Sequence, residues 1–115
     1  MASVAAGARS LDGMVVGILP GPGPVQDLSI VIDTGMGEAR NAILVRSADA
    51  VIVVGGSWGT LSEVAYAGKR GGIPVVSLHG WRILDQSGRP VPGILEATSP
   101  DHAVDLALGP PPPSA

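Results

Sequence analysis

The chain has 115 residues, a formal net charge of −3 and only seven lysines and arginines. This length fits one domain with a modest core, and the charge offers no basic patch for nucleic acid or an anionic membrane. No apolar run is long enough to span a bilayer, and no signal-peptide pattern opens the chain. Since cysteine is absent and the two histidines stand apart, we expect neither a disulfide nor a metal site, and a cytoplasmic location.

Apolar runs and turn residues predict alternating helices and strands along the chain. Apolar runs typical of strands occupy residues 14–19, 28–32, 51–54 and 73–78. Helical patterns occupy residues 2–11, 38–47, 61–70 and 99–108. This alternation predicts an α/β fold over residues 1–108, a doubly wound parallel sheet with right-handed crossovers. Residues 109–115 contain four consecutive prolines and predict a disordered tail.

The segment from Val51 to Glu63 joins an apolar strand to a helix through a glycine-rich turn. Four β-branched residues in a row are typical of a strand buried on both faces. At such a turn, free backbone N–H groups and the helix dipole favour an anion, and missing Cβ atoms let a phosphate approach closely. We interpret the turn as a phosphate-binding loop formed by Gly55, Gly56, Ser57, Trp58, Gly59 and Thr60.

The same turn also has a purely structural interpretation. It lacks the lysine of a P-loop, and its glycine spacing does not fit G-x-G-x-x-G. Thr60 and Glu63 are spaced as a capping box, in which Thr60 caps the helix and Glu63 bonds back to the cap residue. The residues alone leave the phosphate loop and the capped tight turn as open alternatives.

Other polar or glycine-rich turns follow the predicted strands. Gly21 follows the first strand, Thr34 and Gly35 follow the second, and His79 follows the fourth. Ligands of open parallel sheets bind beyond the carboxyl ends of the strands. We therefore expect Gly21, Thr34 and Gly35 to line a ligand crevice together with the 55–60 turn.

Several stretches taken together resemble a known family. They are VGILPG at 16–21, TGMGEARN at 34–41, LVRSADA at 44–50 and GGSWGTLSE at 55–63. This combination resembles the SLOG/LOG superfamily of Rossmann-like proteins, formerly described as lysine decarboxylases, and its branch related to molybdenum cofactor carrier proteins. The resemblance covers residues 1–108. It implies a Rossmann-like fold, a nucleotide-phosphate site and a homodimer or larger homo-oligomer.

The enzymatic branch of this superfamily consists of cytokinin-activating phosphoribohydrolases, which cleave the N-glycosidic bond of N6-substituted AMP. Its signature, P-G-G-x-G-T-x-x-E with an upstream Arg-Lys pair, is matched at Gly56, Gly59, Thr60, Glu63 and Arg40. By this resemblance Glu63 would be the acid/base or charge stabiliser, and Arg40 would hold the 5′-phosphate or orient Glu63.

Three positions depart from the hydrolase pattern. Gly55 replaces the leading proline, Ser57 replaces the second glycine, and Asn41 stands in place of the lysine. The resemblance also implies a strand, a helix and a second strand ahead of Met1, about 45 residues given a βαβ unit of roughly 30 or more. In the family these strands lie near the middle of the sheet, so we expect exposed strand edges and consider the chain an N-terminal truncation or a late start.

Three functions remain open at this point. The chain is a nucleotide- or molybdopterin-type binding or carrier protein, a nucleoside-5′-monophosphate phosphoribohydrolase, or an inactive truncated product. The departures at Asn41 and Ser57 favour the first, whereas Arg40 and Glu63 favour the second. No cofactor is required for these functions. The expected partner is a small phosphorylated ligand, either an AMP-like nucleotide or a molybdopterin-type compound.

Overall fold

The computed structural model describes residues 2–113 and divides into two compact units, with the boundary after Arg40. In the first unit, helix α1 (Ala2–Ser10) precedes two parallel strands, β1 (Val16–Leu19) and β2 (Ile30–Asp33), and the short 3-10 helix η1 (Gly37–Ala39). Both strands end at the same edge of this two-stranded sheet, since Leu19 pairs with Asp33.

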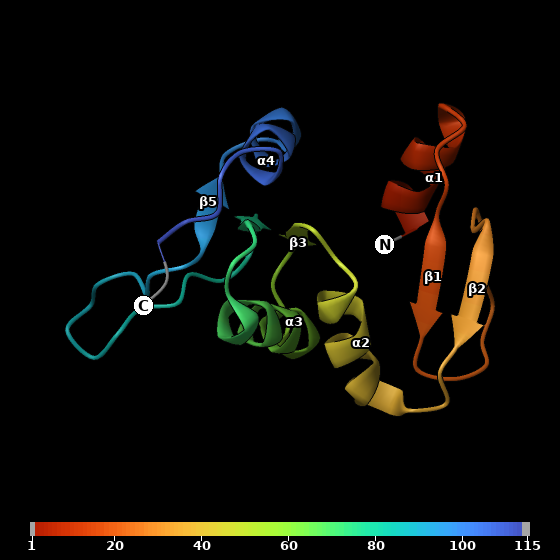
Figure 1. The fold of residues 1–115 in the computed structure, drawn as a ribbon, viewed down its shortest axis with the longest axis horizontal. Helices are drawn as coiled ribbons and strands as arrows, with labels where there is room; N and C mark the ends of the chain where they lie inside the picture. Colours follow the sequence, from red (N-terminus) through yellow and green to blue (C-terminus); the bar gives the residue numbers. More distant parts are fainter. Residues whose placement is uncertain (1, 114–115) are drawn as a thin grey trace. The chain divides into compact units, whose positions relative to one another are not determined.

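The second unit contains a three-stranded parallel sheet in the order β3 (Val51–Val54), β4 (Val75–Leu78) and β5 (Leu95–Ala97). Helix α2 (Arg40–Arg46) precedes β3, helix α3 (Trp58–Arg70) connects β3 to β4, and helix α4 (Pro100–Ala107) follows β5 (Figure 1). The segment 79–94 connects β4 to β5 without a helix and contains a hairpin, in which Leu84 pairs with Pro90.

Strand β4 is the centre of the core of the second unit. Val75 packs with Val45 of α2 and Ala67 of α3 on one face of the sheet, and Val76 packs with Ala103 of α4 on the other face. Side chains alternate between the two faces along a strand. Ser77 therefore lies on the same face as Val75, the face that α3 covers.

Arg70 ties helix α3 to the end of helix α2. Its Nη1 donates hydrogen bonds to the backbone carbonyls of Val45 and Ala48. The last carbonyls of a helix have no intrahelical partner, so a guanidinium at this point stabilises the end of α2.

The predicted α/β, Rossmann-like class is confirmed, because all paired strands are parallel and helices α2 and α3 precede and follow β3. The strands form two sheets, one in each unit. The prediction that strand 51–54 is buried on both faces is wrong. Val53 is buried, but Ile52 and Val54 are 36% and 45% exposed, because β3 is an edge strand of its sheet and α4 lies mainly over β4 and β5.

Helix α4 begins at the predicted cap. Ser99 caps α4 by accepting the N–H of His102, with Pro100 as the first helical residue, as predicted. Residues 109–113 contain no helix or strand, and residues 114–115 of the predicted disordered tail lie outside the described residues. No described helix has the length and apolar character needed to cross a membrane.

Candidate functional site

Ser57 is the N-cap of helix α3, which begins at Trp58. Its backbone is extended (φ −156°, ψ 169°), and its Oγ accepts the N–H of Thr60 at 3.1 Å. The two hydroxyl oxygens of Ser57 and Thr60 are also 3.1 Å apart and form a hydrogen bond. The capping box with Thr60 as cap is therefore wrong. Serine caps at least as well as threonine, and Ser57 comes first in the chain.

The first turn of α3 presents backbone N–H groups that an anion can bind. The first N–H groups of a helix have no intrahelical carbonyl. Ser57 satisfies that of Thr60, which leaves those of Trp58 and Gly59 at the positive end of the helix dipole. A Cβ built on Gly59 would meet nothing closer than Ser57 Oγ, at 3.8 Å. Packing therefore does not require glycine at position 59.

Two other glycines shape the turn. Gly55 adopts a left-handed conformation (φ +83°), and its N–H donates to the Leu78 carbonyl at 2.9 Å, which fixes the start of the turn to β4. A Cβ on Gly56 would come within 2.5 Å of Trp81 Cδ1, so the absence of a side chain lets the Trp81 indole lie against the turn. Trp58, which is 78% exposed, meets Trp81 edge to face with ring centroids 5.1 Å apart.

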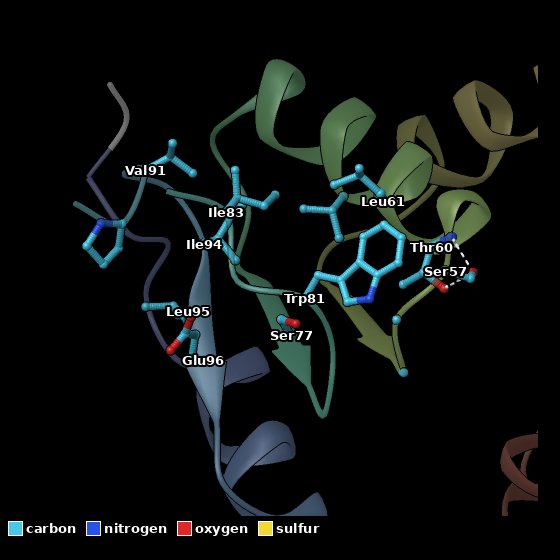
Figure 2. A pocket seen from close by; sticks show the side chains of 14 residues that line it. Ser57, Thr60, Leu61, Ser77, Trp81, Ile83, Val91, Ile94, Leu95 and Glu96 are labelled. Carbon is cyan, nitrogen blue, oxygen red and sulfur yellow. Dashed lines mark hydrogen bonds between the residues drawn. The ribbon is translucent and has the colours of Figure 1, made fainter. Parts of the chain in front are cut away.

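A cavity of about 250 Å³ lies beside the turn in the second unit. Figure 2 shows the Trp81 indole on the side of the cavity near the turn. The apolar lining comes from α3 and the 79–94 segment and includes Leu61, Val64, Ile83, Val91 and Ile94. Side-chain oxygens in the lining belong to Ser57, Thr60, Ser77 and Glu96. The turn is thus one wall of a mainly apolar cavity with few polar atoms.

Of the remaining predicted site residues, Glu63 lies in helix α3 of the second unit, and the other four lie in the first unit near the carboxyl ends of β1 and β2. Thr34 Oγ1 donates to the Leu19 carbonyl at 2.7 Å, and Gly35 has a left-handed φ of +61°. A Cβ on Gly21 would meet nothing within 4 Å. Arg40 Nη1 donates to the Ile18 carbonyl at 3.4 Å. The structure therefore places Gly21, Thr34 and Gly35 after the carboxyl ends of β1 and β2, and Arg40 in a hydrogen bond to β1. A ligand crevice shared with the 55–60 turn stays a prediction.

Asn41 occupies the position of the hydrolase lysine but is buried. Its side chain is 3% exposed, and its Nδ2 lies 3.4 Å from Ser62 Oγ of helix α3. Its Oδ1 is buried without a hydrogen-bond partner in the described structure. Asn41 therefore links α2 to α3 inside the second unit. A lysine ammonium in this environment would carry a large desolvation cost.

The cavity residues that were not predicted include Ser77, Trp81 and Glu96. Ser77 belongs to β4 and Glu96 to β5, and β5 is too short to be recognised from its sequence. Trp81 gave one usable signal, because a large aromatic residue stands in a polar segment directly after a strand. His79 follows β4 as predicted, but it is exposed and does not line the cavity. Within residues 2–113, acidic residues and histidines form no group that could hold a metal ion.

Comparisons with known proteins agree with this fold. The molybdenum cofactor binding protein of the phototrophic bacterium Rippkaea orientalis is 35% identical, with a TM-score of 0.75 over 92% of this chain and 68% of its own. The molybdenum cofactor carrier protein of Chlamydomonas reinhardtii is 31% identical, with a TM-score of 0.70 over 88% of this chain and 64% of its own.

A curated relative of uncharacterised function from Archaeoglobus fulgidus is 44% identical over 95 residues, and the chain spans 61% of the length of that relative. Residues 1–104 match the model of the SLOG cluster4 family. This match covers both units, including the glycine turn and the start of α3. The chain therefore belongs to the SLOG cluster4 family.

Proposed function

We propose that the chain binds a phosphorylated small ligand of the molybdopterin type at the Gly55–Thr60 turn and holds it without converting it. The observation that carries this proposal is the open N-terminus of α3. The N–H groups of Trp58 and Gly59 lie at its positive end, and a Cβ on Gly59 would fill space that the structure leaves empty. This cradle suits a phosphate group.

The names of the two structural relatives support the molybdopterin part of the proposal, since both are described as molybdenum cofactor proteins. The molybdenum cofactor supplies redox chemistry at its metal when bound. In our proposal the Trp58 and Gly59 N–H groups hold its phosphate, and the Ser57 and Thr60 hydroxyls add hydrogen-bonding capacity beside them.

The burial of Asn41 supports a binding role over hydrolysis. The hydrolase pattern has a lysine at this position, whereas here an uncharged side chain is directed at Ser62 of α3 and is shielded from solvent. One cation of the hydrolase pattern is therefore missing, and the local packing does not favour its replacement. Ser57 also accepts the Thr60 N–H through its Oγ, a side-chain hydrogen bond that the glycine of the hydrolase signature cannot make.

The test has two arms on protein that unfolds cooperatively. In the first, the chain and its Glu63→Ala variant are incubated with N6-substituted AMP, and free base is measured by chromatography. We expect no base from either protein. Base release by the wild type that Glu63→Ala abolishes would overturn the non-catalytic role and establish a hydrolase.

In the second arm, the chain is mixed with molybdenum cofactor and passed through gel filtration. The retained pterin is then measured by fluorescence after oxidation. We expect pterin to elute with the protein at a stoichiometry that inorganic phosphate lowers by competition. Elution of all pterin with the small molecules would contradict the proposal.

A further inference from the structure

Ser77 and Glu96 form a polar floor in the cavity. They are direct partners in the pairing of β4 with β5, so their side chains emerge next to each other on the same face of the sheet. This is the face that α3 covers, and both residues line the cavity (Figure 2). The two side chains are therefore adjacent groups that one ligand can contact together.

The Ser77 hydroxyl has no partner in the described structure. The residue is 8% exposed and lines the cavity. Among the described residues the one buried polar side-chain atom without a partner is Asn41 Oδ1, so Ser77 Oγ is not enclosed and is open to the cavity. It can donate a hydrogen bond to a polar ligand atom there, or accept one from it.

The Glu96 carboxylate is oriented by Arg82, whose Nε lies 3.1 Å from Glu96 Oε1. This ion pair is solvent-exposed, with 62% and 50% of the two side chains accessible, so it contributes little stability. It occupies one of about four acceptor positions of the carboxylate. The others remain able to accept N–H groups, and an ionised carboxylate can accept two parallel ones from a planar partner.

The flat apolar walls and the small volume of the cavity favour a planar ring system over a flexible chain or a whole nucleotide. The Trp81 indole, Ile83 and Ile94 provide flat and apolar surface. The volume of about 250 Å³ is below that of sites for drug-sized ligands, roughly 300–1,000 Å³. The cavity therefore suits one ring system, with the rest of the ligand extending toward the glycine turn.

We propose that this cavity binds a 2-amino-4-oxo heterocycle, the ring edge shared by pterins and guanine, with Glu96 accepting its N–H and amino groups and Ser77 contacting its oxo side. Adenine does not fit this floor, because it presents a lone pair beside its amino group and a carboxylate only accepts hydrogen bonds. The inference deepens the proposed function by naming the ring, and it does not depend on the phosphate turn.

The test uses ligands without phosphate. Pterin and lumazine differ in that lumazine carries an oxo group in place of the 2-amino group, and their binding is followed by quenching of tryptophan fluorescence. Both tryptophans of the chain, Trp58 and Trp81, lie at this site. We expect pterin to bind about 10- to 100-fold more tightly than lumazine, the range for hydrogen bonds to a charged group.

Variants of Glu96 and Ser77 test whether these two residues cause the preference for pterin over lumazine. The isosteric Glu96→Gln variant should bind pterin and lumazine with about equal affinity. The control is Asp105→Asn, which neutralises an exposed carboxylate on α4 and should keep the wild-type preference for pterin. Ser77→Ala should weaken pterin and lumazine alike, because both carry the 4-oxo group. Guanosine and inosine, which differ in the 2-amino group of the base, form the same comparison for a purine without phosphate. The tighter of pterin and guanosine shows which ring system the cavity prefers.

Equal affinity for pterin and lumazine in the wild type, or an unchanged preference in Glu96→Gln, would overturn the inference. Absence of both pterin and guanosine binding in cooperatively folded protein would also overturn it. If a variant fails to fold, the wild-type comparison still decides. Phosphate binding without pterin preference would refute the ring assignment alone, and pterin preference without phosphate binding would refute the phosphate turn alone.

Discussion

The Trp81 indole lies against Gly56 so closely that a Cβ on Gly56 would come within 2.5 Å of Cδ1 and 2.7 Å of Nε1 of that ring. This contact joins the start of the glycine turn to the segment after β4, which the sequence places 25 residues later. It makes Trp81 a shared wall of the turn and of the adjacent cavity. The turn and the cavity are therefore one structural feature.

This contact predicts the effect of Gly56→Ala. The new methyl group must displace the Trp81 indole and break its edge-to-face contact with Trp58, at a cost of about 0.5–1.5 kcal/mol from the aromatic pair alone. Near-UV circular dichroism and tryptophan emission should both change. Gly68→Ala in α3 is the control, because a Cβ there meets nothing within 4 Å. Unchanged spectra in Gly56→Ala would contradict the contact.

The two serine caps, Ser57 and Ser99, should contribute similarly to stability, but only Ser57 should contribute to phosphate binding. Ser57 caps α3 and Ser99 caps α4, each by accepting an N–H at 3.1 Å. Replacement of either by alanine should lower the free energy of unfolding by about 1 kcal/mol in urea titrations. Only Ser57→Ala should weaken phosphate binding, measured by calorimetry. Equal phosphate affinity in both variants would exclude Ser57 from the binding site.

The burial of Asn41 predicts how the chain responds to the hydrolase residue. Asn41→Lys places a charge at a site that is 3% exposed, and should destabilise the protein by about 3–5 kcal/mol, as an uncompensated buried charge does. Ile43→Lys on the same helix, at a position that is 36% exposed, should cost much less. Similar unfolding midpoints for the two variants would mean that position 41 faces solvent.

Local patterns were sufficient to predict the fold class and the glycine turn. The run at 51–54, the glycines at 55–59 and the helical pattern after them specify a strand, a turn and a helix through short-range physics. The identity of the cap was harder to predict, because Ser57 and Thr60 both have capping side chains. The choice depends on where the turn ends, which Gly55 and its bond to Leu78 determine.

The cavity could not be predicted, because its parts come together only through long-range pairing. Ser77 and Glu96 become neighbours when β5 pairs with β4, and Trp81 reaches Gly56 only because no helix connects these strands. The division into two sheets is likewise a matter of strand pairing, which residue patterns along the chain do not encode. The same limit applies to β3, whose apolar residues are those of a buried strand although it lies at an edge.

Phosphate binding at the open N-terminus of α3 is tested most directly by calorimetric titration of phosphate into the wild type, Gly59→Ala and Gly68→Ala. Both substitutions lie in α3 where a Cβ meets no close contact, so each should raise stability by up to about 1 kcal/mol. We predict that Gly59→Ala weakens phosphate binding at least tenfold while Gly68→Ala leaves it unchanged. Equal phosphate affinity in all three proteins, or no binding by the folded wild type, would mean that the N-terminus of α3 is not a phosphate site.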